Sequence, residues 1–283
     1  MVSVLTSLRT VLPRFAAVLV LLAGLLGLAA PAAAADTPVD VALILAIDVS
    51  RSIDVDEAQL QREGYVEAFR DPKLIRAIGS GFLGKIAVAY FEWAGSGYAR
   101  IIVPWTLIDG EKSAHAFADA LSHHSPLSER RTSISGAINF ATHWFDGSGF
   151  QGTRRVVDIS GDGPNNDGEL VTTARQRAIA AGITINGLPI LKKDGGFYSL
   201  FNIPNLDLYY RDCVIGGAGA FMEVAANFSD FARAVRRKLI LEIAGRSRRK
   251  TEAMILPAQA GPDARVPPPC DIGEQIMHRL GDP

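Results

Sequence analysis

The chain has 283 residues, of which 48% are hydrophobic and 21% are charged, and its formal net charge is −1. This composition is that of a folded globular protein and excludes a largely disordered chain. Because neither sign of charge is in excess, the sequence predicts no nucleic-acid partner and no other polyanion.

The first 35 residues have the features of a secretory signal peptide. Arg9 and Arg14 precede an uncharged apolar run over residues 15–30, and small residues ending at Ala35 form an A-x-A cleavage motif. An uncleaved membrane anchor is the alternative, because the run is nearly long enough to span a bilayer. Cleavage is favoured because the run becomes alanine-rich and lacks a basic flank. We therefore expect residues 1–35 to be removed, leaving a periplasmic or secreted chain without a membrane span.

The mature chain begins with a strand followed by a helix. Residues 39–47 (VDVALILAI) form a nearly continuous apolar run, which is typical of a strand buried on both faces of a parallel sheet. An amphipathic helical pattern follows from Ala58 to Phe69 and ends near Pro72.

The next two strand-like runs predict a hairpin. Residues 86–93 and 99–107 are joined by a short loop that contains glycine, which favours a β-hairpin. Pro104 lacks a backbone N–H, so the second of these strands is expected at an edge of the sheet. Helical patterns follow over residues 112–123 and 133–144.

The alternation of strands and helices then resumes. The expected elements are strands over 155–160, 184–191 and 221–225 and helices over 170–181 and 228–243. Residues 192–220 predict an insertion or an irregular connection. The whole pattern predicts an α/β fold, a doubly wound and mostly parallel central sheet with one antiparallel edge strand and helices on both faces. This domain would cover residues 36–245, and a Pro-rich C-terminal tail without clear periodicity would cover residues 246–283.

Polar residues occupy three predicted loops where a doubly wound sheet forms its ligand site, at the carboxyl ends of strands. Asp48, Ser50 and Ser52 follow the first strand, Thr132 stands at a helix start, and Asp162 follows a later strand. Two carboxylates and three hydroxyls are hard oxygen donors, so they predict a divalent cation, Mg²⁺ first, with Mn²⁺ or Ca²⁺ as alternatives. In a competing interpretation these residues only cap helices and turn corners.

The same residues carry a family resemblance. The Asp-x-Ser-x-Ser of residues 48–52, Thr132 and the Asp-Gly of residues 162–163 resemble, in order and spacing, the metal-ion-dependent adhesion site of von Willebrand factor A domains. The chain resembles that family over residues 39–245, and more narrowly a group of exported bacterial proteins of unassigned function. One departure is Gly161, which stands where many members of the family have Thr.

The resemblance implies a division of roles at the metal. Ser50, Ser52 and Thr132 would bind the ion directly, whereas Asp48 and Asp162 would act mainly through water or from a second layer. One coordination position would stay open for an acidic side chain of a partner protein. Binding of that partner could shift the last helix of the domain.

The two cysteines, Cys213 and Cys270, are candidates for a disulfide that ties the tail to the domain, because export leads to an oxidising compartment. Two unpaired thiols are the alternative, since a sequence does not show whether the two Cα atoms approach closely.

The leading functional hypothesis is an exported, metal-dependent binding module without enzymatic activity. Its partner would be a protein of unknown identity that supplies a carboxylate. One alternative is an Mg²⁺-dependent hydrolase, for which the sequence offers neither a second metal cluster nor an evident general base. The other is a structural envelope protein whose metal only stabilises the fold.

Overall fold

A computed structural model of the protein describes residues 35–124, 127–191, 201–244 and 265–281. The predicted signal peptide, except for Ala35, and most of the first half of the predicted tail lie outside these residues. Within the described residues, no helix combines the length and apolarity that crossing a bilayer requires.

The centre of the fold is a five-stranded sheet with the order β3-β2-β1-β4-β5. Its strands are β1 (Thr37–Asp48), β2 (Ile86–Trp93), β3 (Ala99–Ile108), β4 (Phe150–Gly161) and β5 (Ile183–Pro189). β1 pairs in parallel with β2 and β4, β4 pairs in parallel with β5, and β3 is antiparallel to β2. Pro104 thus lies in an edge strand, where its missing N–H costs no ladder hydrogen bond. The predicted fold class is confirmed.

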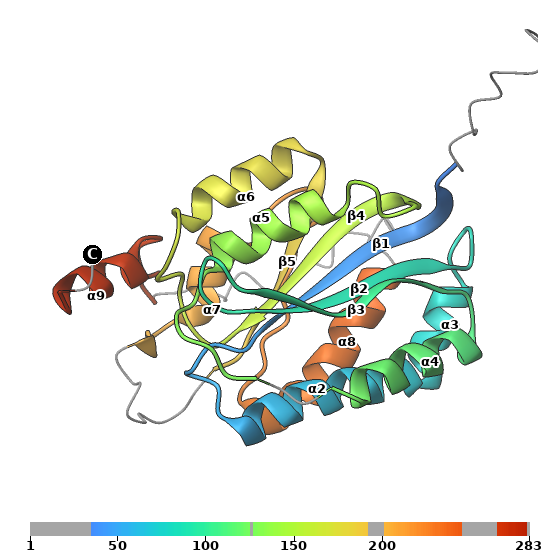
Figure 1. The fold of residues 1–283 in the computed structure, drawn as a ribbon, viewed down its shortest axis with the longest axis horizontal. Coiled ribbons are helices and arrows are strands. Elements are labelled where there is room, and N and C mark those ends of the chain that lie inside the picture. The colour runs from blue at the N-terminus through green and yellow to red at the C-terminus, as the bar shows by residue number, and fades with distance from the viewer. Residues whose placement is uncertain (1–34, 125–126, 192–200, 245–264, 282–283) are drawn as a thin grey trace, which may run out of the picture. The chain divides into compact units, whose positions relative to one another are not determined.

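The apolar run of β1 is buried because helices cover both faces of the sheet (Figure 1). Successive side chains of a strand point to opposite faces. One set packs with α2, α3, α4 and α8, and the other packs with α5 and α6. The first set is Val41, Leu43, Leu45 and Ile47, and the second is Ala42, Ile44 and Ala46.

The helices of the described residues follow the predicted order with three additions, α3, α7 and α9. They are α2 (Val55–Arg70), α3 (Pro72–Gly79), α4 (Glu111–Ser122), α5 (Ile134–Trp144), α6 (Val171–Ala180), α7 (Leu206–Tyr209), α8 (Phe231–Ile243) and α9 (Ile272–Arg279). The sequence predicted only a helix end near Pro72. In the structure Pro72 begins α3, because proline suits the first turn and the Asp71 side chain accepts from the Lys73 N–H as its N-cap.

The predicted last strand over 221–225 is wrong. This segment forms only isolated parallel bridges to β5, between Gly187 and Met222 and between Ile190 and Ala225. The ladder is interrupted because the Phe221 N–H donates to the Asn186 side chain. Pro189 in β5 also has no N–H to offer.

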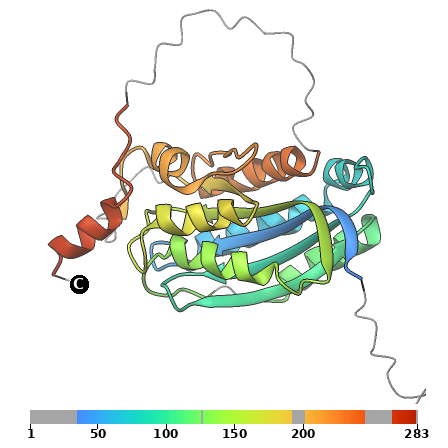
Figure 2. The same ribbon diagram turned by 90° about the horizontal axis from the view of Figure 1, so that it is seen from above.

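Two segments without a predicted pattern are ordered. After residues 192–200, which lie outside the described residues, α7 continues into a π-helical turn, Tyr210–Val214, whose Tyr210 and Cys213 are buried. The predicted tail contains α9. Figures 1 and 2 show α9 beyond one end of the sheet. A 3₁₀ turn, Phe228–Asp230, leads into α8, so the predicted closing helix is confirmed.

A charged cluster is buried between β4 and α8. The Lys238 Nζ lies 2.6 Å from Asp158 Oδ1 and 3.0 Å from Glu242 Oε1, and all three side chains are almost fully buried. The Asn186 amide donates to the same Glu242 oxygen at 2.6 Å. One ammonium thus faces two carboxylates. Burial raises the pKa of Asp158 to about 7, and the Lys238 charge opposes this only in part.

This cluster makes stability depend on pH. In the unfolded chain an aspartate ionises near pH 4, so between about pH 4 and pH 7 the folded protein retains a proton on Asp158 that the unfolded chain releases. The free energy of unfolding contributed by Asp158 therefore falls as pH rises through that window. We expect the Asp158→Asn variant to lose less stability than wild type between pH 4.5 and 7.5, measured by urea unfolding in EDTA. The exposed Asp146→Asn variant is the matched control and should follow wild type; equal slopes for all three proteins would contradict the prediction.

Candidate functional site

The first predicted loop folds back on the end of the central strand. Asp48 is the last residue of β1, and its Oδ1 accepts a hydrogen bond from the Ser50 backbone N–H at 2.7 Å. The hydroxyls of Ser50 and Ser52 lie 3.0 Å apart. The loop thus directs one carboxylate and two hydroxyls toward the same place at the carboxyl edge of the sheet.

The other two loops meet the first. Because β4 runs parallel to β1, Asp162 emerges beside it, and the Ser52 hydroxyl donates to Asp162 Oδ1 at 2.7 Å. The Thr132 N–H donates to the Asn166 side chain at 2.8 Å, and the Asn166 N–H donates to the Thr132 carbonyl at 2.8 Å. Ser50, Ser52 and Thr132 line one cavity of about 260 Å³. The structure therefore brings the sequence-predicted site residues together.

The capping interpretation is wrong for these residues. The N-cap of α2 is Asp54, which forms a capping box with Glu57. The N-cap of α5 is Ser133, whose hydroxyl accepts from the Gly136 N–H at 3.1 Å. Other side chains therefore provide the helix caps, and Asp48, Ser52 and Thr132 are not needed for them.

The asparagines after Asp162 join two loops of the site, a role that the sequence did not favour. Neither Asn165 nor Asn166 caps the next helix, because the N-cap of α6 is Leu170. Asn165 Oδ1 instead accepts from the Ser135 N–H at 2.9 Å, as Asn166 does from Thr132. Both asparagines are buried. They hold the second and third loops together.

The site buries two carboxylates of like charge side by side. Asp48 is fully buried and Asp162 is 3% exposed. Burial, and then the charge of Asp162, raise the pKa of Asp48 to about 8. Asp48 Oδ2 has no hydrogen-bond partner among the described residues. A buried carboxylate oxygen without a donor, beside a second carboxylate and three hydroxyls, fits a hard divalent cation.

Any cation at this site would depend on the hydroxyls. Among the described residues, no group of three or more His, Cys, Asp or Glu side chains is placed to hold a metal. With only two carboxylates at the site, the three hydroxyls would supply the remaining oxygen donors of the protein.

Gly161 explains the departure from the family pattern. A Cβ atom at this position would lie 2.8 Å from Asp48 Oδ2 and 2.8 Å from the Tyr210 hydroxyl. A threonine therefore does not fit here without displacing one of them. Tyr210 is fully buried, and burial together with the charges of Asp48 and Asp162 raises its pKa well above the ordinary value.

Residues that the sequence interpretation missed form the walls of the cavity. Three arginines line it, namely Arg51, Arg130 and Arg131. Phe201, Met277 and Leu280 contribute apolar surface. Arg131 has a φ of 70°, in the left-handed region that a non-glycine residue rarely adopts. Arg51 lies between Ser50 and Ser52 in the sequence, and Arg130 and Arg131 directly precede Thr132. This proximity to the predicted site residues is the sequence feature that could have indicated their place in the cavity.

The family can be stated from the sequence. A family model described as a protein of unknown function (DUF1194) matches residues 38–247. The chain belongs to the DUF1194 family. No functionally curated protein matches it.

Solved structures similar to this DUF1194 chain share its fold. The zinc-bound form of proximal thread matrix protein 1 from the mussel byssus aligns with a TM-score of 0.51 and 16% identity, covering 74% of this chain and 49% of that one. The pilus adhesin SpaC from Lactobacillus rhamnosus GG aligns with a TM-score of 0.52 and 14% identity, covering 74% of this chain and 31% of that one. The chain spans about half of the first protein and about a third of the second.

A von Willebrand factor type A protein from Catenulispora acidiphila aligns with a TM-score of 0.46 and 15% identity, covering 74% of this chain and 43% of that one. Identities this low show the fold alone. The matrix protein and the adhesin, with TM-scores of 0.51 and 0.52, carry the fold comparison and confirm the predicted von Willebrand factor A-like fold. Metal binding by Asp48, Ser50, Ser52, Thr132 and Asp162 stays a prediction.

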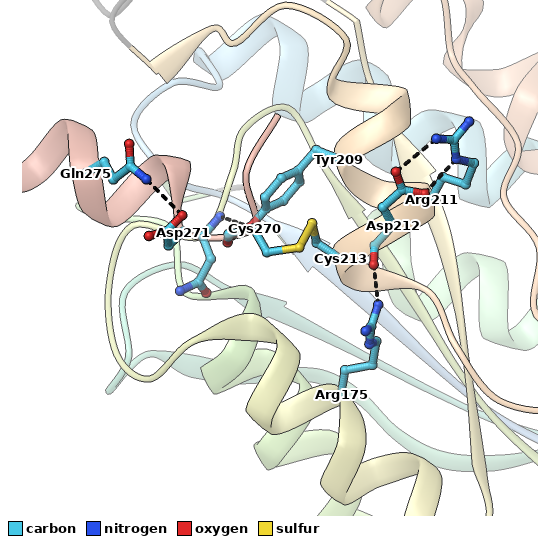
Figure 3. Close-up of a disulfide and its surroundings, with 9 residues drawn as sticks. Arg175, Tyr209, Arg211, Asp212, Cys213, Cys270, Asp271 and Gln275 are labelled. Carbon is cyan, nitrogen blue, oxygen red and sulfur yellow. Dashed lines mark hydrogen bonds and ion pairs between the residues drawn. A yellow bond between two sulfur atoms is a disulfide. The ribbon is translucent and has the colours of Figure 1, made fainter. Parts of the chain in front are cut away.

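The two cysteines of this DUF1194 protein are paired. Cys213 and Cys270 form a disulfide with their Cα atoms 5.4 Å apart (Figure 3). The predicted link between tail and domain is confirmed. The bond joins the π-helical turn after α7 to the residue two positions before α9.

Removing the charge of Asp48 should stabilise the metal-free protein. In Asp48→Asn the side-chain oxygen can still accept from Ser50, but the repulsion from Asp162 and the cost of burying the carboxylate are lost. We expect the free energy of unfolding in EDTA at pH 7.5 to rise by about 1 kcal/mol or more. Urea unfolding measures it, with exposed Asp146→Asn as the control. A clear loss of stability would show that the carboxylate is compensated by contacts within the chain.

Proposed function

We propose that this DUF1194 protein is an exported binding module that uses a divalent metal to capture a carboxylate of a partner protein. The observation that carries the proposal is the convergence of two buried carboxylates and three hydroxyls, with Asp48 Oδ2 lacking a hydrogen-bond donor among the described residues. This donor set suits Mg²⁺ best, with Mn²⁺ or Ca²⁺ as alternatives.

Each residue has a role in holding the ion. Ser50, Ser52 and Thr132 supply hydroxyl oxygens that line the cavity and would bind the metal. Asp48, oriented by the Ser50 N–H, and Asp162, oriented by the Ser52 hydroxyl, supply the negative charge. When bound, the metal offers an electrophilic position to an incoming carboxylate oxygen.

Two further observations support export and protein binding. A disulfide such as Cys213–Cys270 persists in oxidising compartments, which agrees with a periplasmic or secreted location. Structures of the same fold include a pilus adhesin and a byssus matrix protein whose adhesion-type metal motif holds zinc. These likenesses concern the fold, and they support a binding role because one of these proteins is an adhesin and the other is a matrix protein.

Metal binding can be tested by calorimetry on the chain that begins at Asp36. We expect Mg²⁺ and Mn²⁺ to bind wild type, and Ser52→Ala and Asp162→Ala to weaken binding at least about tenfold, because each removes an oxygen donor or the group that orients it. Exposed Ser80→Ala and Asp146→Ala are matched controls that should bind as wild type does. Circular dichroism should show the same fold in all five proteins.

The outcomes separate the candidate functions. Absence of metal binding to wild type, or equal binding by site and control variants, would contradict the proposed site. If metal raises the melting temperature but no acidic ligand binds to the loaded protein, the metal serves only stability. Metal-dependent hydrolysis of a phosphoester that Ser52→Ala abolishes would favour the hydrolase.

A further inference from the structure

The C-terminal helix is fixed beside the metal loops by a covalent bond and a close backbone contact. Cys270 is bonded to buried Cys213, and its carbonyl lies 3.5 Å from the Tyr209 hydroxyl (Figure 3). Three residues later, Gly273 packs so tightly that a Cβ atom would lie 1.7 Å from the Asn165 carbonyl oxygen. No residue larger than glycine fits there unless α9 moves away. The disulfide and this close contact therefore fix the position of α9 on the domain.

The surface that α9 packs against is the third loop of the site, the one that follows β4. Glu274 Oε1 accepts from the Asn165 amide at 2.7 Å, and the same Asn165 also accepts from the Ser135 N–H. Burial raises the pKa of Glu274, and the hydrogen bond from Asn165 opposes this. α9 thus contacts Asn165, the residue that joins the second and third loops and lies three positions after Asp162 in the chain.

One face of α9 points into the cavity of the site. Gly273 and Met277 are four residues apart in α9, so they lie on the same side of the helix, and Leu280 follows as its C-cap residue. Gly273 makes the close contact, while Met277 and Leu280 line the cavity together with Ser50, Ser52 and Thr132. Met277 is 8% exposed and Leu280 is 53% exposed, so Leu280 still offers apolar surface.

The cavity also has a basic part. Arg51, Arg130 and Arg131 line the cavity, and neither Arg51 nor Arg130 forms an ion pair with another residue that the structure describes. A guanidinium binds carboxylates through its fork of N–H donors. The cavity lining thus combines a candidate metal position, positive charge from the arginines and apolar surface from Met277 and Leu280.

We infer that α9 is a wall of the ligand site, and that the site binds an acidic peptide segment of a partner. In this segment one acidic residue would reach the metal, a second would meet Arg51 and Arg130, and a neighbouring apolar side chain would pack on Met277 and Leu280. The inference rests on the proposed function and adds to it the class of partner and the residues that select it. α9 would determine ligand specificity without binding the metal.

The test is selection of a displayed random heptapeptide library on the immobilised chain from Asp36, in Mg²⁺, with elution by EDTA. Wild type should enrich peptides with two acidic residues and one apolar residue close together. Leu280→Ala should bind a selected peptide at least about fivefold more weakly and Mg²⁺ unchanged. Arg51→Ala with Arg130→Ala should lose the preference for the second acid, whereas Arg76→Ala on α3 is the matched control and should keep it.

The position of α9 can be tested separately. Cys213→Ser with Cys270→Ser should still bind Mg²⁺ and acidic peptides but lose the apolar preference, since the tether of α9 is gone. If that variant fails to fold, Gly273→Leu, which retains the disulfide, should give the same result by displacing α9 from Asn165.

The proposed function and the role of α9 would be contradicted by different results. If wild type enriches no acidic peptides, or enriches them equally without Mg²⁺, the proposed function is wrong. If it enriches acidic peptides in a Mg²⁺-dependent way, but without an apolar preference and with equal affinity for Leu280→Ala, the proposed function stands and the role of α9 is overturned.

Discussion

The structure depends on the parallel pairing of β1 and β4, which places two aspartates next to each other inside the protein. Ile47 of β1 pairs with Ser160 of β4, so the two strands end at the same edge of the sheet. Asp48 and Asp162 therefore lie next to each other there. Two buried carboxylates repel each other, and each costs free energy to remove from water. The Ser50 N–H and the Ser52 hydroxyl offset part of that cost. A divalent cation would offset the rest, which makes the site unfavourable for stability without one.

β4 links the site to the last helix of the domain. Asp158, on the same strand that ends before Asp162, contacts Lys238 of α8 in the core. A shift of α8 on ligand binding, which the family resemblance suggests, would have to move Lys238 relative to Asp158. This ion pair therefore opposes such a shift in the present chain.

Local pattern was sufficient to predict the sheet and to place the five candidate residues together at its carboxyl edge, because both depend on short-range signals. The apolar run over 39–47 marks a buried strand, and polar residues directly after strands of a doubly wound sheet must lie at one edge. The failures depend on contacts distant in sequence. The segment over 221–225 resembles a strand, but the Asn186 side chain and Pro189 in β5 interrupt its ladder. The sequence of residues 221–225 itself shows neither of these effects.

Local pattern also failed in the tail, where the prolines suggested no regular structure and the structure contains a helix of only eight residues. A helix this short is not stable alone in water, so its formation depends on what it packs against. Gly273 would be a poor residue in an isolated helix, and only the position of Asn165 shows why glycine is required there. The disulfide closes a loop with a sequence separation of 57, which by chain entropy stabilises the fold by about 4 kcal/mol. Because this bond lies outside the metal loops, it can fix a wall of the cavity without changing the oxygen donors. Metal affinity would thus be carried by the three loops that hold the oxygen donors and the arginines, whereas the apolar part of ligand selectivity would be carried by the C-terminal segment around α9.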